Sequence, residues 1–124
     1  MTIPIVIVEA HPALRAALRA LLEREFDFEV VGEAASASEM LRVAKELRPR
    51  VILLDSALPD LQIFPAICRL HRVLPEVAVL LLIDWENRHL EQGALRAGAA
   101  GCVVTRAAGA TLASVVRALA QDDV

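Results

Sequence analysis

The sequence predicts an α/β fold, a doubly wound parallel sheet in which five strands alternate with five helices. Short β-branched or leucine-rich runs alternate along the chain with longer stretches in which apolar residues recur at helical spacing. This alternation is typical of βαβ units, because a helix must cross the sheet before the next parallel strand begins. The 124 residues contain no internal repeat and no linker, so we expect a single domain over residues 1–124.

The chain begins with a strand and a helix that differ clearly in pattern. Residues 3–8 are continuously apolar, as expected of a strand covered by helices on both faces, and Pro4 lies at its start, where a missing N–H is tolerated. Pro12 suits the first turn of a helix, which leucines at helical spacing extend to Arg24. Residues 29–34 form a less apolar strand, which we expect at the edge of the sheet.

The middle of the chain repeats this order of strand and helix. Ser36 to Glu39 has the pattern of a capping box and opens a helix that runs through Leu47. Residues 51–55 are the third strand, an apolar run that ends in a carboxylate. A turn at Leu58 to Asp60 leads into a helix that contains residues 64–70.

The last third of the chain supplies two more strands and two more helices. Residues 77–83 are the longest apolar run and the fourth strand. A helix over residues 87–97 is expected to end at Gly98, since a positive φ costs little only for glycine. Residues 101–104 form a short fifth strand, and apolar residues at helical spacing mark the last helix over residues 111–120.

The overall composition excludes several classes of protein. A net charge of −3, a pI near 5.6 and scattered arginines give no basic surface, so we expect no nucleic-acid binding by this chain alone. Cys68 and Cys102 lack the spacing of a disulfide framework or a metal site and are expected to be buried thiols. No apolar run approaches the roughly 18 residues of a membrane span, so we expect a cytoplasmic protein without membrane contact.

Five short segments are spaced along nearly the whole chain: Ile7-Val8-Glu9-Ala10-His11-Pro12, Val30-Val31-Gly32-Glu33-Ala34, Arg48-Pro49-Arg50-Val51-Ile52-Leu53-Leu54-Asp55, Leu58-Pro59 and Leu95-Arg96-Ala97-Gly98-Ala99-Ala100-Gly101. Their order and spacing resemble the receiver domains of bacterial two-component response regulators, most closely those of the NarL/FixJ type. The resemblance implies a flavodoxin-like (βα)5 fold with strand order 2-1-3-4-5 and a site at the carboxyl ends of strands one, three and four. Regulators of this type usually continue into a helix-turn-helix effector domain. Residues 1–124 contain none, so control of transcription is implied by the resemblance alone.

The resemblance implies that Asp55 is the equivalent of the phosphoacceptor, which a histidine kinase or a small phosphodonor modifies. That chemistry needs a divalent cation, held by two acids after the first strand and by the aspartate itself. The first acid aligns with Glu9, but the second, usually the direct ligand, aligns with Ala10. A primary metal ligand is therefore missing, and Glu9, Asp55 and Asp84 remain the alternative set of carboxylates for a metal ion.

Other positions of the implied site also depart from the family pattern. The hydroxyl residue that ends the fourth strand aligns with Ile83, and the small residue after it aligns with Asp84, which adds a negative charge. The lysine after the fifth strand aligns with Thr105, and Arg106 is a poor substitute because one step along a strand reverses the side-chain direction. The aromatic residue of the fifth strand aligns with Cys102.

We therefore interpret the chain as a pseudo-receiver, which is a receiver-like domain with a degenerate phosphorylation site. We expect it to be no enzyme and to bind no cofactor. Its expected role is that of a phosphorylation-independent protein-interaction module. Partners, among them a second copy in a homodimer, are expected on the last two helices with strand 101–104, or on the first and last helices. No histidine kinase is expected to phosphorylate it. The alternative is a phosphorylatable switch that accepts a phosphoryl group on Asp55 with altered Mg²⁺ chemistry. A small-ligand binder at the same end of the sheet is a third hypothesis, supported by fold analogy alone.

Overall fold

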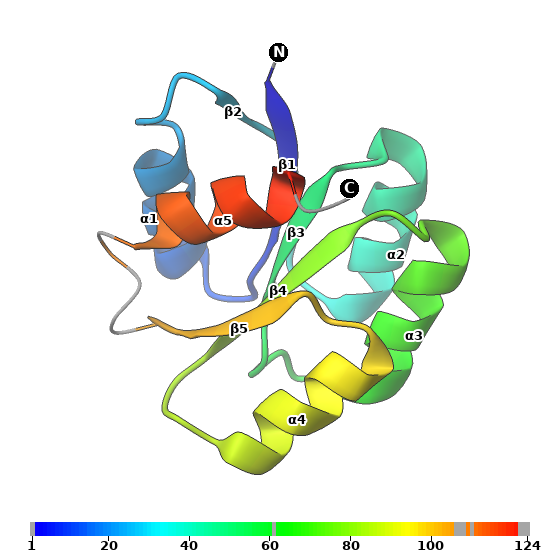
Figure 1. The fold of residues 1–124 in the computed structure, drawn as a ribbon. Helices are drawn as coiled ribbons and strands as arrows, with labels where there is room; N and C mark the ends of the chain where they lie inside the picture. The colour runs from blue at the N-terminus through cyan, green and yellow to red at the C-terminus, as the bar shows by residue number, and fades with distance from the viewer. Residues whose placement is uncertain (1, 61, 106–108, 110, 122–124) are drawn as a thin grey trace.

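The computed structural model describes residues 2–60, 62–105, 109 and 111–121. Its strands form one parallel sheet in the predicted order β2-β1-β3-β4-β5, with helices on both faces (Figure 1). The strands are β1 Ile3–Val8, β2 Phe28–Ala34, β3 Val51–Asp55, β4 Ala78–Ile83 and β5 Gly101–Val104. The helices are α1 Pro12–Leu22, α2 Ala37–Leu47, α3 Ile63–Val73, α4 Arg88–Ala97 and α5 Leu112–Gln121. Within these described ranges, no helix combines the length and the apolar character needed to cross a membrane.

Two hydrophobic cores lie on opposite faces of the sheet. Because successive side chains of a strand point to opposite faces, Ile52 and Leu54 of β3 join one core while Val51 and Leu53 join the other. Helices α2, α3 and α4 cover the first face, and α1 and α5 cover the second (Figure 1). All four of these β3 side chains are fully buried. The strand that ends in Asp55 is therefore packed firmly from both sides.

Helix α2 begins at the capping box that the sequence predicts, and α4 ends at the predicted glycine. Ser36 Oγ accepts a hydrogen bond from the Glu39 N–H at 3.2 Å, and the Glu39 carboxylate accepts one from the Ala35 N–H at 2.9 Å, which starts α2. The Asn87 side chain caps α4 in the same manner. Gly98 follows α4 with a φ of 117°, which confirms the predicted glycine stop.

Two predictions made from the sequence are wrong. Helix α1 ends at Leu22 and not at Arg24, because the Glu25 N–H bonds to the carbonyl of Leu22 at 3.1 Å in the turn that leads to β2. Cys68 is exposed and not buried, because the residue before it faces the sheet and one step along a helix rotates the side chain by about 100°. The Cys68 thiol instead donates to the carbonyl of Ala97 at the end of α4, at 3.7 Å.

Candidate functional site

Two carboxylates meet at the carboxyl edge of the sheet. Strands β1 and β3 are neighbours and pair Val8 with Leu54, so the residues that follow, Glu9 and Asp55, lie next to each other. Glu9 is 3% exposed and Asp55 is 9% exposed. Among the described residues, these two are the buried residues with a charged side chain. Since an ionised carboxylate loses hydration when it is buried, this pair requires compensation from its surroundings.

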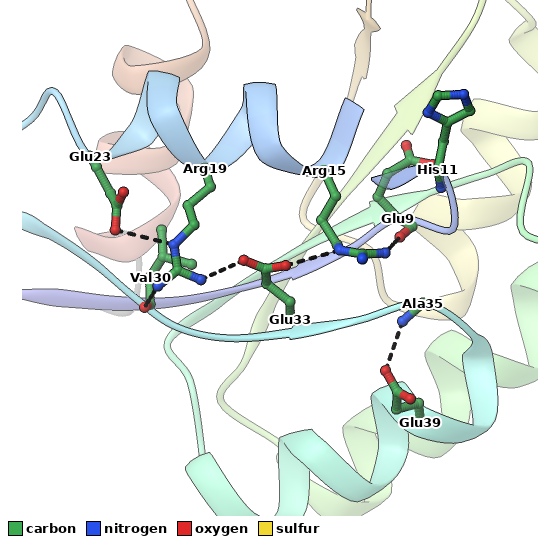
Figure 2. A network of polar contacts seen from close by, with 9 residues as sticks. All are labelled: Glu9, His11, Arg15, Arg19, Glu23, Val30, Glu33, Ala35 and Glu39. Carbon is green, nitrogen blue, oxygen red and sulfur yellow. Dashed lines mark hydrogen bonds and ion pairs between the residues drawn. The ribbon is translucent and has the colours of Figure 1, made fainter. Parts of the chain in front are cut away.

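The Glu9 side chain is folded back along the loop between β1 and α1. Its Oε2 accepts a hydrogen bond from the His11 N–H at 3.0 Å, and its backbone N–H donates to the carbonyl of Ala34 at 2.9 Å. Arg15 Nη1 donates to the backbone carbonyl of Glu9 at 2.8 Å (Figure 2). Arg15 thus holds the backbone of this loop through the Glu9 carbonyl, while the Glu9 carboxylate accepts from the backbone N–H of His11.

The same arginine belongs to a network that joins α1 to the edge strand β2. Arg15 Nε pairs with Glu33 at 2.9 Å, and Arg19 pairs with the other oxygen of Glu33 and with Glu23 (Figure 2). Hydrogen bonds from Arg19 first, and from Arg15 next, hold the pKa of the Glu33 carboxyl below its ordinary range. This network was not predicted from the sequence, although two arginines four positions apart on a helix that covers β2 were the available signal.

Asp55 forms few polar contacts with the residues that the structure describes. Its Oδ1 accepts one long hydrogen bond, from the Ala57 N–H at 3.3 Å. Over the residues that the structure describes, neither Asp55 nor Glu9 forms an ion pair with a lysine or an arginine. Burial raises the pKa of the Glu9 carboxyl, the His11 N–H opposes that rise, and the neighbouring Asp55 carboxylate adds to it. Burial and the neighbouring Asp55 carboxylate thus both make ionisation of the Glu9 carboxyl less favourable.

The remaining predicted positions provide no ligand for a phosphoryl group in the described part of the site. Ala10 is half-buried and packs against the core under α2. Ile83 is 2% exposed and packs in the same core. Thr105 has a hydroxyl, but its Oγ1 donates to the carbonyl of Ile83 at 3.0 Å. The position of Arg106 lies outside the described residues.

Two further positions complete the comparison with the sequence. Cys102 is half-buried, and burial, followed by the charge of Glu91, raises the pKa of its thiol to about 11. Asp84 is exposed. No group of three or more His, Cys, Asp or Glu side chains that could hold a metal ion occurs among the described residues. The structure therefore brings Glu9 and Asp55 together but does not assemble them with Asp84 into a three-carboxylate site.

Comparisons with known proteins agree with this fold. The family model for the response regulator receiver domain matches residues 5–117. The response regulator protein VraR of Staphylococcus aureus is 32% identical over 117 residues, which cover 94% of this chain. The chain spans 56% of the length of that protein.

Solved structures show the same similarity. A two-component response regulator of the LuxR family from Aurantimonas sp. has a TM-score of 0.91 and 28% identity, covering 97% of this chain and 86% of the other. The signal receiver domain of the regulator NarL from Mycobacterium tuberculosis has a TM-score of 0.91 and 25% identity, covering 98% of each chain. With a family model that matches most of its length, the chain belongs to the response regulator receiver domain family.

Proposed function

We propose that this receiver domain has lost phosphoryl-transfer chemistry and acts in two-component signalling as a phosphorylation-independent interaction module. The observation that carries the proposal is the buried Glu9 and Asp55 pair, which lies beside Ala10 and has no ion pair with a lysine or arginine among the described residues. An effector domain that would read the interaction is implied only by the longer relatives, of which this chain matches about half.

Charge arithmetic supports the loss of phosphorylation. An acyl phosphate on Asp55 would add a charge of roughly −2 next to Glu9. Two unit charges about 5 Å apart at an effective dielectric near 20 repel by roughly 3 kcal/mol, so each added charge makes the product costly unless a cation offsets it. Ala10 offers no carboxylate to hold a metal ion, and the Thr105 hydroxyl is engaged with the backbone of β4.

The test of this proposal is the mass of the intact protein after incubation with Mg²⁺ and acetyl phosphate. We expect no change in mass, both in the unmodified chain and in Asp55→Asn. A stable gain of one phosphoryl group that disappears in Asp55→Asn would overturn the proposal and favour the alternative, a phosphorylatable switch. Trp85 gives an independent readout, since it is the single tryptophan and is 66% exposed next to Asp84. Saturable quenching of its fluorescence by millimolar Mn²⁺ would also favour the switch.

The interaction face that the proposal assigns is the outer surface of α1 and α5, hereafter the α1–α5 face. On α1 its exposed residues are small or apolar, and they are Pro12, Ala13, Leu14, Ala16, Ala17 and Ala20. The two charged residues of α1 are directed to Glu33 on β2 (Figure 2). On α5 the exposed residues Ser114 and Ala118 are also small and uncharged. An uncharged face of small side chains can meet its own copy closely without charge repulsion, so the occupant we assign is a second copy of this chain.

This face is held in position by a separate ion-pair network. Arg117 of α5 pairs with Asp27 and Glu25 at 2.8 Å each, in the turn before β2, and lies over the ring of Phe28. The helix is thereby fixed to the same edge of the sheet as α1. By contrast, the exposed surface of α4 carries several charged residues, Arg88, Glu91 and Arg96 among them. We therefore favour the α1–α5 face over the face formed by α4, β5 and α5.

A charge placed on the α1–α5 face is expected to separate the two copies. We expect Ala17→Glu to shift the protein from dimer to monomer and to weaken self-association at least about 10-fold, because two buried carboxylates would meet across a symmetric interface. Gln92→Glu, an equally exposed change on α4, is the matched control and should leave the dimer intact. Sedimentation equilibrium measures both variants. A dimer that survives Ala17→Glu but dissociates in Gln92→Glu would place the interface on α4 instead.

A further inference from the structure

We propose that the hydroxyl of Thr105 locks the carboxyl ends of β4 and β5 together, so that the loop between β4 and α4 keeps one conformation without any phosphoryl group. The inference rests on the proposed function, because it states how that site is regulated. It assigns Thr105 a positioning role and not a catalytic one.

The contact itself joins two strands that are far apart in sequence. Thr105 directly follows β5, and its Oγ1 donates to the carbonyl of Ile83, the last residue of β4, at 3.0 Å. The backbone pairing of the two strands ends where Ile83 is opposite Val104. The side-chain bond therefore extends the connection between β4 and β5 one step beyond that pairing, to the point where the chain leaves the sheet.

The other side of this junction is also fixed. The Ile83 side chain is 2% exposed and packs in the core under α3 and α4. Side-chain packing and the hydrogen bond from Thr105 to the Ile83 carbonyl therefore both restrain this residue. Beyond the exposed residues that follow, the Asn87 side chain caps α4 by accepting from the Leu90 N–H at 3.1 Å. The loop between β4 and α4 is thus fastened at both ends by hydrogen bonds of the protein itself.

The loop after β3 is fastened in a similar way. The Ser56 N–H donates to the carbonyl of Leu82 on β4 at 2.9 Å. Farther along, the Asp60 carboxylate accepts from the Ala37 N–H at 2.9 Å and from the Ser38 N–H at 3.3 Å at the start of α2, which holds the pKa of Asp60 below its ordinary range. The loops above Asp55 are thus connected to their neighbours before any ligand arrives. The bond of Thr105 differs from the others because it comes from the position at which the family resemblance places a phosphate-binding lysine.

Two substitutions separate the hydroxyl from the shape of the side chain. Thr105→Val keeps the branched shape and removes the donor, whereas Thr105→Ser keeps the donor. The readout is amide hydrogen exchange of residues 90 and 91, whose N–H groups bond to Asn87 at the end of the loop, with residues 5–8 and 51–54 as the reference for global stability. In Thr105→Val we expect exchange of residues 90 and 91 to become about 3- to 10-fold faster, as the loss of one partly buried hydrogen bond implies, while the reference amides are unchanged. In Thr105→Ser we expect exchange close to that of the unmodified chain.

The outcomes are distinct from those that test the loss of phosphorylation. Protection of residues 90 and 91 that is equal in Thr105→Val and in the unmodified chain would overturn the lock, and so would an acceleration spread equally over the reference amides. The unmodified chain is also measured with Mg²⁺ and beryllofluoride, and we expect its protection to stay the same. A gain of phosphoryl mass in the unmodified chain with unchanged exchange at residues 90 and 91 would refute the proposed function and leave the lock standing.

Discussion

The variant Ala10→Asp/Ile83→Thr/Thr105→Lys is expected to take up one phosphoryl group from acetyl phosphate in the presence of Mg²⁺, whereas the unmodified chain takes up none. The first change supplies a carboxylate for the metal ion next to Glu9 and Asp55. The other two supply a hydroxyl and an ammonium group for the phosphoryl oxygens. We expect the modified fraction to rise from undetectable to most of the protein, measured by intact mass.

The control for this gain of function is the same variant with Asp55→Asn added, which is expected to remain unmodified. Circular dichroism verifies that each variant is folded, since Ile83→Thr places a hydroxyl in a core position that is 2% exposed. A folded triple variant that still takes up no phosphoryl group would show that these three positions do not account for the loss. The explanation based on missing ligands and missing positive charge would then be wrong.

Removal of one charge from the buried pair is expected to stabilise the fold. Burial raises the pKa of Glu9 in the folded protein, so the folded state holds a proton on this carboxyl more tightly than the unfolded chain does. A raised carboxyl pKa gives stability that is complete below the unfolded pKa and is lost as pH rises through the folded pKa. Once Glu9 is ionised, the folded chain no longer has this contribution. We expect Glu9→Gln to be more stable at pH 7, by on the order of 1 kcal/mol, because the amide is neutral and still accepts the His11 N–H.

Urea denaturation at pH 4 and pH 7 measures this effect. The gain in free energy of unfolding for Glu9→Gln is expected at pH 7 and should shrink toward pH 4, where the unmodified carboxyl is increasingly protonated in both states. Asp84→Asn is the matched control: its carboxylate is exposed, and we expect a change within about 0.5 kcal/mol at either pH. A Glu9→Gln variant that is less stable than the unmodified chain at pH 7 would mean that the Glu9 charge is compensated in solution.

The fold could be predicted from the sequence where the signal is local. Strands β3 and β5 have the predicted bounds, because the apolar run of β3 ends abruptly at Asp55 and that of β5 begins at Gly101 and ends before Thr105. The less apolar residues 28–34 do form an edge strand. The end of α1 was misjudged because the signal that stops it is a backbone bond from Glu25, in a segment that also pairs with the distant Arg117. Helical spacing likewise identified Ile67 and Leu70 as buried residues of α3. It did not show that Cys68, one step round the helix from Ile67, is exposed.

The residue types at the candidate site can be read from the sequence, but their geometry cannot. Alignment of Ala10, Ile83 and Thr105 with the family pattern predicts that ligands are missing, and this stays a prediction. The direction of the Glu9 carboxylate depends on a backbone N–H two residues away, and the partner of Thr105 lies 22 residues earlier in the chain. No local pattern encodes either contact, because both depend on how the loops meet above the sheet.

We expect the site around Asp55 to bind neither Mg²⁺ nor a phosphoryl group, because its two buried carboxylates have no ion pair with a lysine or arginine among the described residues. The most direct measurement is a two-dimensional ¹⁵N NMR titration of the unmodified chain, first with Mg²⁺ and then with beryllofluoride. We predict no saturable shifts for the amides of residues 9–11, 55–57 and 83–85. Saturable shifts that cluster at these residues and vanish in Asp55→Asn would contradict the claim.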